Sequence, residues 1–232
     1  ERPRMGSDPP RLVLAPIDVA APVADTLLSG TAAVLTSATL ALGGSFDPMA
    51  RTLGLTLSED PWEGLDVGTP FDYSRQGILY TPTHLPRPAA GISEAALDEI
   101  LALTEASGGG VLGLFSSRRA AQEAAEVLRG ATDLTVYAQG EDQLPTLVEA
   151  FTREEDSCLV GSLSLWQGVD VPGHTCRLVI IDRIPFPRPD DPVAQARIEA
   201  VTAAGGNGFM SVAATHAALL LAQGAGRLVR RA

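Results

Sequence analysis

The stretch Leu178-Val179-Ile180-Ile181 is apolar at every position. A strand with one face in water alternates apolar and polar residues, so an unbroken apolar run is typical of a strand buried on both faces of a parallel sheet. Similar runs occur upstream and are separated by segments of helical periodicity. The sequence therefore predicts an α/β fold, in which helices cover both faces of a parallel sheet and the crossovers are right-handed.

The same patterns predict elements along the whole chain. Ser45 is expected to cap the helix that runs through 49–53, and Gly54 to end it. A looser stretch at 64–76 indicates a domain boundary, which gives domains of residues 1–70 and 71–232. The expected strands are 11–17, 32–35, 78–80, 111–115, 134–137, 158–161 and 177–182. The expected helices are 22–29, 49–53, 93–105, 117–128, 143–151, 192–204 and 210–230.

The composition is that of a globular protein. Hydrophobic residues make up 45% of the 232 residues, enough to bury a sizeable core. No apolar run approaches the length of a membrane span and the amino terminus has no signal-peptide pattern, so we expect a cytoplasmic protein without a membrane partner. Cys158 and Cys176 are too few for a disulfide framework or for an iron–sulfur cluster with four thiolates, and we expect core thiols.

The charged residues limit the possible functions. The formal net charge of −11 argues against a general attraction to nucleic acid, although a local basic groove remains possible. The chain contains no lysine, so a phosphate-binding loop of the G-x-x-x-x-G-K-[ST] type cannot occur in it. If nucleotide chemistry takes place here, the main phosphate-binding loop lies elsewhere, and no metal ligands are predicted in this chain.

Several polar segments follow predicted strands and are expected at the ligand-binding edge of the sheet. Ser116, Ser117 and Arg118 lie at the start of a helix, where they suit an anion, although an ordinary serine cap explains them too. The loop 161–173 contains Ser162, whose hydroxyl suits a phosphate, and Trp166, which suits a stacked base or the protein core. Further along this loop, Asp170 suits ribose hydroxyls, an arginine partner or a simple turn.

Two further segments carry polar side chains in a regular arrangement. Thr36, Ser37, Ala38 and Thr39 follow the buried strand predicted at 32–35. If 210–230 is one helix, the side chains of Gln223, Arg227 and Arg230 project from one face. Two guanidinium groups on one face favour a phosphate clamp, and the alternative is a basic helix end that complements the helix dipole.

Four of these segments occur in the order and spacing of helicase motifs. The chain resembles the C-terminal part of DinG/XPD-like superfamily 2 DNA helicases, and is most similar to DinG-type proteins of actinobacteria. The resemblance covers nearly the whole chain. The matching segments are Thr36–Thr39 for motif III, Leu114–Arg118 for motif IV, Ser164–Asp170 for motif V and Gln223–Arg230 for motif VI.

The resemblance implies a motor of two RecA-like domains, with ATP between them and single-stranded DNA across the top. It assigns Gln223, Arg227 and Arg230 to the γ-phosphate of ATP, and Gly168 and Asp170 to the nucleotide. It assigns DNA contacts to Ser116, Ser117, Arg118, Ser162 and Trp166, and the coupling of hydrolysis to DNA movement to Thr36–Thr39. Where the family commonly has a glutamate, this chain has Gln167, so no carboxylate role is carried over to that position.

The resemblance also implies parts that this chain does not contain. The phosphate-binding loop and the magnesium-binding box of the first motor domain would hold ATP and Mg²⁺, and an iron–sulfur cluster would belong to the same missing part. Residues 1–70 then close the first motor domain, 71–232 form the second, and the chain is expected to be a piece of a longer protein. The expected partners are the rest of the first motor domain, single-stranded DNA and duplex junctions. The alternatives are a helicase-derived interaction module without motor chemistry, and an unrelated α/β enzyme for a phosphorylated ligand.

Overall fold

The computed structural model describes residues 12, 14–89, 91–162, 165 and 175–229. Contacts within the chain divide it into two compact units. The helical unit contains residues up to Val67 together with Pro187–Ala214, and the sheet unit contains Gly68–Phe186 together with the chain from Thr215 onward. The assignment of 1–70 and 71–232 to two motor domains stays a prediction.

The sheet unit is built on four parallel strands in the order β2-β3-β1-β4. In the central pairing, Val111 of β1 lies opposite Cys158 of β3 and Leu178 of β4. Each strand coincides, within a residue or so at each end, with a run predicted from the sequence. The strands are β1 (Val111–Phe115), β2 (Thr135–Ala138), β3 (Ser157–Ser162) and β4 (Leu178–Ile181).

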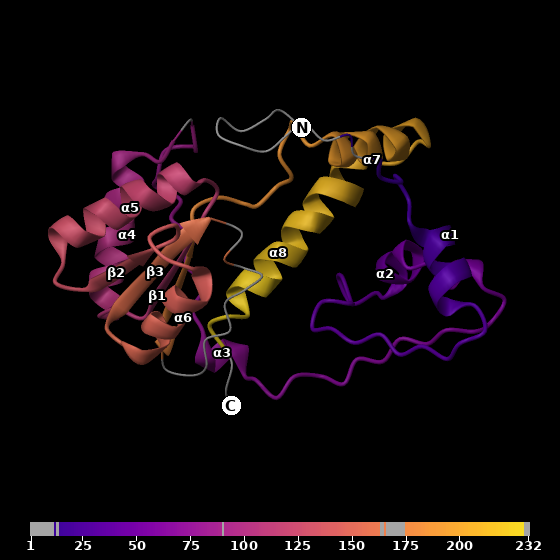
Figure 1. Cartoon of the computed structure of the whole chain (residues 1–232), viewed down its shortest axis with the longest axis horizontal. Coiled ribbons are helices and arrows are strands. Elements are labelled where there is room, and N and C mark those ends of the chain that lie inside the picture. The colour runs from indigo at the N-terminus through magenta and orange to yellow at the C-terminus, as the bar shows by residue number, and fades with distance from the viewer. Residues whose placement is uncertain (1–11, 13, 90, 163–164, 166–174, 230–232) are drawn as a thin grey trace. The chain divides into compact units, whose positions relative to one another are not determined.

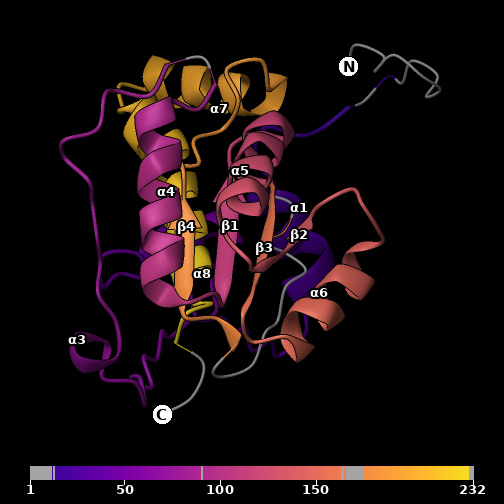
Figure 2. The same ribbon diagram turned by 90° about the vertical axis from the view of Figure 1, so that its left-hand side faces the viewer.

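Helices cover both faces of this sheet, as the unbroken apolar runs predicted. Alternate residues of β1 point to opposite sides: Val111 and Phe115 join a core cluster with α4 and α5, whereas Leu112 and Leu114 join another with α6 and α8. Figure 1 shows the strands among their helices, and Figure 2 shows α4 and α5 lying over one face. The helices are α4 (Glu94–Ser107), α5 (Arg118–Ala131), α6 (Leu144–Arg153) and α8 (Thr215–Ala225).

Serine side chains begin the two helices on one side of the sheet. The Ser93 hydroxyl oxygen accepts a hydrogen bond from the amide of Ala96 at 3.2 Å, and Ser117 accepts one from Ala120 at 3.1 Å. Both bonds satisfy an amide that has no partner within its helix. The predicted starts of α4 and α5 are therefore correct, and α5 extends to Ala131 rather than to the expected 128.

Glycines and an ion pair close the amino-terminal edge of the sheet. A Cβ atom on Gly109, which has φ +95°, would lie 2.8 Å from the Cα of Asp156, so the chain passes too closely for a larger residue. The Arg177 guanidinium donates to the carbonyl of Gly108 at 2.8 Å and lies 3.1 Å from the Asp156 carboxylate. These contacts fix the loops that precede β1, β3 and β4.

The helical unit contains helices and no named strand among its described residues. Gly54, with φ +74°, lets the chain pass so near Ala20 that a Cβ atom would lie 2.1 Å from the Ala20 carbonyl oxygen. Arg197 of α7 donates to the carbonyl of Ile17 at 2.8 Å, which ties the two sequence parts of this unit together. Its described helices are α1 (Ala20–Val23), η1 (Ala24–Leu28), α2 (Asp47–Thr52), η2 (Leu55–Leu57), α7 (Pro192–Ala203) and η5 (Phe209–Ala214). The sheet unit also contains the short helix α3 (Tyr73–Gln76). In the parts that the structure describes, no helix is long and apolar enough to cross a membrane.

Three predicted strands are wrong. The described residues of 11–17, 32–35 and 78–80 form no strand, and Val34 and Ile78 are 95% and 91% exposed. A strand exists only where a neighbour accepts its backbone hydrogen bonds, and no such neighbour occurs among the described residues. An apolar run by itself therefore establishes neither burial nor pairing in this sheet.

The predicted helix 210–230 is also wrong as one continuous element. A π-helix spans Phe209–Ala214, α8 follows and ends at Ala225, and the amides of Arg227 and Leu228 then bond to carbonyls three residues back. Glycine is a poor helix former, and Gly224 and Gly226 flank this end. Gln223 therefore lies on the last turn of α8, and Arg227 lies in the turn that follows it.

The beginning of the chain shows two smaller differences. The expected helix 22–29 is a short α-helix followed by the π-helix η1. The residue that precedes α2 is Phe46 rather than the predicted cap Ser45, although the Ser45 hydroxyl oxygen still accepts a hydrogen bond from the Asp47 amide at 3.1 Å. The predicted end at Gly54 agrees with its left-handed conformation.

Gly161 should be intolerant of even one added methyl group. Its Cβ atom would lie 2.3 Å from Cδ1 of the fully buried Leu165 and 2.8 Å from Cβ of Gln139. We expect Gly161→Ala to lower the free energy of unfolding by about 1–3 kcal/mol, the usual cost of overpacking. Urea unfolding followed by circular dichroism measures the change.

Gly130→Ala provides the matched control, because a Cβ atom at Gly130 on α5 would meet nothing within 4 Å. This change should raise stability by about 0.5–1 kcal/mol through the better helix propensity of alanine. Equal effects of the two changes would contradict the close approach at Gly161.

Both cysteines should be unreactive in the folded protein. Burial raises the pKa of the Cys158 thiol to about 11, so almost no thiolate, the reactive form, is present near neutral pH. Cys176 is also buried. At pH 8 a chromogenic disulfide reagent should label neither thiol until denaturant is added, and then both. Rapid labelling of the native protein would show that this core opens readily.

Candidate functional site

The carboxyl-terminal edge of the sheet brings three predicted loops together. Phe115 at the end of β1 pairs with Ser162 at the end of β3, and Leu114 pairs with Ile181 at the end of β4. The residues that follow these strands, Ser116 and Asp182, therefore begin side by side. This edge is the usual ligand-binding side of a parallel α/β sheet.

Ser116 is bound to Asp182 through two hydrogen bonds. Its amide donates to Oδ1 at 2.7 Å and its hydroxyl donates to Oδ2 at 2.8 Å. The Asp182 side chain is only 5% exposed. Burial raises the pKa of the Asp182 carboxyl, while the hydrogen bonds from Ser116 and the charge of Arg183 oppose that rise. The Ser116 hydroxyl, which we predicted for an anion, and the Ser116 amide are therefore both engaged by a carboxylate of the same chain.

Arg183 extends this connection to the segment before α4. Its Nε lies 3.9 Å from Asp182 Oδ2, and its Nη2 donates to the carbonyl of Ala89 at 2.7 Å and to that of Gly91. A guanidinium that bridges a carboxylate and backbone carbonyls fixes all of them at once, because its donors have a rigid planar geometry. The end of β4 is thus tied to the start of α5 and to the carbonyls of Ala89 and Gly91.

Ser162 is engaged in a similar way. Its amide and its hydroxyl both donate to Oε1 of Gln139, at 2.8 and 2.9 Å. Gln139 follows β2, and its backbone N–H donates to the carbonyl of Val160 in β3 at 2.9 Å. The β2 and β3 ends are therefore tied together, and the Ser162 hydroxyl points along the sheet edge to an amide oxygen.

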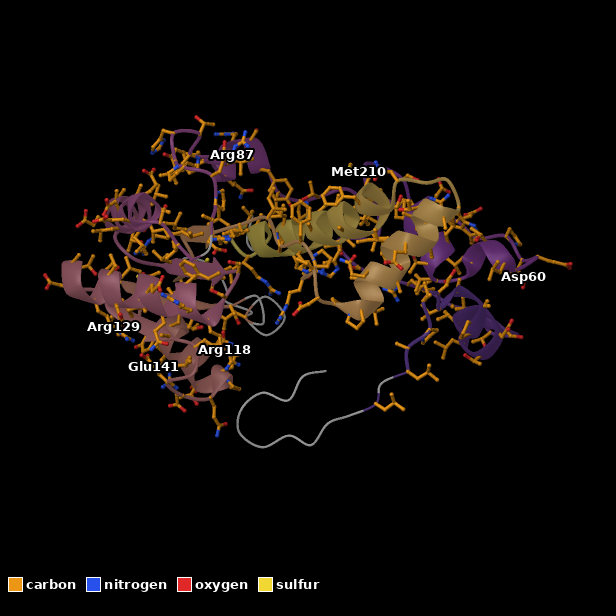
Figure 3. All side chains as sticks on the ribbon, turned by 90° about the horizontal axis from the view of Figure 1, so that it is seen from above. Asp60, Arg87, Arg118, Arg129, Glu141 and Met210 are labelled. Atoms are coloured by element: carbon orange, nitrogen blue, oxygen red, sulfur yellow. The ribbon has the colours of Figure 1, made fainter. Side chains whose placement is uncertain are left out.

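Ser117 and Arg118 are the other predicted residues at this edge. Ser117 caps α5, so the serine-cap interpretation is correct, and both residues are exposed. Arg118 makes no hydrogen bond or ion pair with any described residue. Figure 3 shows it at the opposite end of α5 from Arg129, whose guanidinium binds Glu141 at 2.7 Å. Arg118 is thus the cation at this edge that the described fold does not use.

The predicted site residues at the end of α8 form a second part of the candidate site. Gln223 is exposed on the last turn of the helix, and Arg227 is half-buried, with a buried Nε atom. The chain after α3 runs close by, since a Cβ atom on Gly77 would lie 4.0 Å from Leu228. A guanidinium held in partly buried surroundings is suited to a phosphate group. Arg230, Trp166, Gly168 and Asp170, with Gln167, lie outside the described residues.

The predicted coupling segment Thr36, Ser37, Ala38 and Thr39 belongs to the helical unit. The Ser37 hydroxyl oxygen accepts from the Thr39 amide at 3.2 Å and lies 3.2 Å from the Thr39 hydroxyl, which makes a local turn. Ser37 and its neighbours Thr36 and Ala38 are exposed. The segment is therefore a surface turn rather than the end of a buried strand.

The structure adds two residues that the sequence analysis did not single out, Asp182 and Gln139. Each is a polar residue directly after a strand, which is the signal that identified Ser116 and Ser162. Among the described residues, no group of three or more His, Cys, Asp or Glu is arranged to hold a metal ion. The predicted site residues carry guanidinium, hydroxyl and amide groups, which can donate hydrogen bonds to an anionic ligand.

Comparison with known proteins identifies the family. Residues 100–232 match the family described as the helicase C-terminal domain. The ATP-dependent helicase DinG of Mycobacterium tuberculosis is 57% identical over 222 residues, which cover 95% of this chain and 33% of that protein. The ATP-dependent DNA helicase YoaA of Escherichia coli is 37% identical over 86% of this chain and 31% of its own length.

A third relative, the 3'-5' exonuclease DinG of Bacillus subtilis, is 31% identical over 86% of this chain and 22% of its own length. The chain thus spans about a third or less of the relatives that it matches. The family match covers more than half of the chain, including the whole parallel sheet and α8. The chain therefore belongs to the helicase C-terminal domain family.

Proposed function

We propose that this chain is the C-terminal motor-domain part of an ATP-dependent DNA helicase of the DinG type. In the longer protein it would couple ATP hydrolysis to movement along single-stranded DNA and to duplex unwinding, in the cytoplasm. The family match over 100–232 carries the proposal. It is supported by the parallel pairing of β1 with β3, because the motif IV segment includes the end of β1 and the motif V segment follows β3 in the sequence.

The proposed nucleotide-binding role rests on the arginines after α8. The guanidinium groups of Arg227 and Arg230 would bind the γ-phosphate, with Gln223 beside them, and Gly168 and Asp170 would approach the nucleotide from the loop after β3. Charge accumulates on the phosphate oxygens during transfer, and a permanently charged planar fork stabilises it. ATP and Mg²⁺ would be held mainly by the first motor domain, because this chain has no lysine for a phosphate-binding loop.

The proposed DNA-binding role rests on the carboxyl-terminal edge of the sheet. Ser117, Arg118, Ser162 and Trp166 are suited to phosphates and stacked bases rather than to base edges, so binding would depend little on sequence. Ser116 would belong to the same DNA-binding segment, with its two donors held by Asp182. Single-stranded DNA and duplex junctions are the proposed substrates. Thr36–Thr39 would couple hydrolysis to DNA movement, and the rest of the first motor domain would be the partner of residues 1–70.

The proposal predicts a sharp difference between the chain alone and the full-length gene product that contains it. The purified 232-residue chain should not hydrolyse ATP, because it cannot supply the phosphate-binding loop. The full-length product should hydrolyse ATP, and single-stranded DNA should stimulate it. Steady-state phosphate release with and without single-stranded DNA measures both.

Three outcomes contradict this proposal in different ways. DNA-dependent turnover by the chain alone would show a phosphate-binding site that the sequence does not predict. A full-length product that binds DNA without hydrolysing ATP would favour the interaction module. Hydrolysis of a phosphorylated small molecule without any DNA effect would favour an unrelated α/β enzyme.

Arg227→Ala tests the nucleotide-binding role in the full-length product. An arginine finger typically contributes about 10³–10⁵ in turnover, or roughly 4–7 kcal/mol of transition-state stabilisation. We expect DNA-stimulated hydrolysis to be nearly abolished while affinity for single-stranded DNA stays close to normal, and the same for Arg230→Ala. Arg227→Lys should restore little, since a point charge does not reproduce the bidentate fork.

Arg153→Ala is the matched control, because Arg153 on α6 is 77% exposed and, among the described residues, its guanidinium is bound to Glu149 four residues earlier. This change should leave hydrolysis near the wild-type rate. If Arg227→Ala lowers turnover only in proportion to lost DNA binding, or no more than the control does, Arg227 is simply a basic residue at a helix end.

A further inference from the structure

The contacts of Ser116 conflict with a direct role in binding phosphate. A serine that contacts a phosphate oxygen donates its hydroxyl, and often its amide, to that oxygen. Here both donors point to the two oxygens of Asp182, at 2.7 and 2.8 Å. A phosphate at Ser116 would lose these donors and would also meet a carboxylate of like charge at hydrogen-bond distance.

The same contacts give Asp182 a definite mechanical effect on α5. Ser116 is followed at once by Ser117, which caps the helix, and by Arg118, its first residue. Because Asp182 holds both the backbone and the side chain of Ser116, it fixes the turn from which Ser117 and Arg118 project. Asp182 is held in turn by its burial and by Arg183, which is anchored on the carbonyls of Ala89 and Gly91.

We propose that Asp182 is a positioning residue that holds the start of α5 so that Ser117 and Arg118, rather than Ser116, meet the phosphodiester backbone of single-stranded DNA. This inference rests on the proposed DNA-binding function. Arg118 is exposed, is engaged by no described residue and carries the charge that a phosphate requires. The Ser117 hydroxyl oxygen accepts a hydrogen bond from the Ala120 amide, so the hydroxyl proton points elsewhere and can be donated to a phosphate.

The proposal predicts that removing the Asp182 carboxylate weakens DNA binding, whereas simple electrostatics predicts that it strengthens DNA binding. Removing a carboxylate near bound DNA should tighten binding through reduced repulsion, whereas removing a positioning carboxylate should weaken it. In the full-length product we expect Asp182→Ala to lower the affinity for single-stranded DNA about tenfold. The DNA concentration for half-maximal hydrolysis should rise by the same factor, and the rate at saturating DNA should stay within about twofold of wild type.

Two further variants test how Asp182 acts. Arg118→Ala should weaken DNA binding and make the slope of log affinity against log salt shallower by about 0.7, the loss of one phosphate contact on a single strand. In that background Asp182→Ala should have no further effect, because the group that it positions is gone. Ser116→Ala, which keeps the amide bond to Asp182, should weaken binding less than twofold.

The controls separate positioning from unfolding and from charge. Asp182→Asn keeps the shape and one acceptor for Ser116, so it should restore most of the affinity that Asp182→Ala loses. Asp156→Ala removes a carboxylate at the opposite edge of the same sheet, where it is paired with Arg177, and should not weaken DNA binding. Thermal unfolding of every variant shows that the folded fraction is the same in each assay.

The results distinguish failure of the inference from failure of the proposed function. If the wild-type product neither binds single-stranded DNA nor hydrolyses ATP in response to it, the proposed function fails, and this inference with it. If the wild type is active but Asp182→Ala binds DNA as tightly as wild type or more tightly, the inference alone is wrong. Losses from Asp182→Ala and Arg118→Ala that multiply in the double variant would also overturn it.

Discussion

The central pairing of β1 with β3 on one side and β4 on the other is the constraint on which the sheet unit depends. Val111, Leu114 and Phe115 have no exposed surface, and each buried apolar side chain of this kind contributes about 1.5–3 kcal/mol. Alternate β1 residues serve two separate cores, so one strand holds helices on both faces. The same pairing fixes where β1, β3 and β4 end, and therefore where the polar loops begin.

At the carboxyl-terminal edge the loops are joined by side chains from neighbouring strands rather than by contacts along the chain. Asp182 binds the start of α5, Gln139 binds the end of β3, and Arg183 reaches back to the segment before α4. Asp182 and Gln139 each accept hydrogen bonds from the backbone amide and the hydroxyl of one serine, so the backbone and the side chain of that serine are fixed together. An edge organised in this way holds its loops in a fixed arrangement, as the proposed role in a motor domain would require.

The acidic composition limits how this chain could contact DNA. A chain with a net charge of −11 is not attracted to DNA as a whole, so any contact must depend on a few well-positioned cations. All its strong cations are arginines, and several of them are committed to the fold: Arg177 closes the amino-terminal edge, and Arg129 and Arg183 bind backbone carbonyls. Arg118 is one that the described fold does not engage.

The sequence by itself determined the parallel sheet, the helices that cover it and the family, because unbroken apolar runs, serine caps and motif order are local features. It failed at 32–35 and 78–80, since a strand depends on neighbours that a local pattern does not contain. It also extended the last helix past the two glycines that end α8. Only the tertiary structure decided the partner of Ser116, because Asp182 is 66 residues away and reaches it through the pairing of β1 with β4.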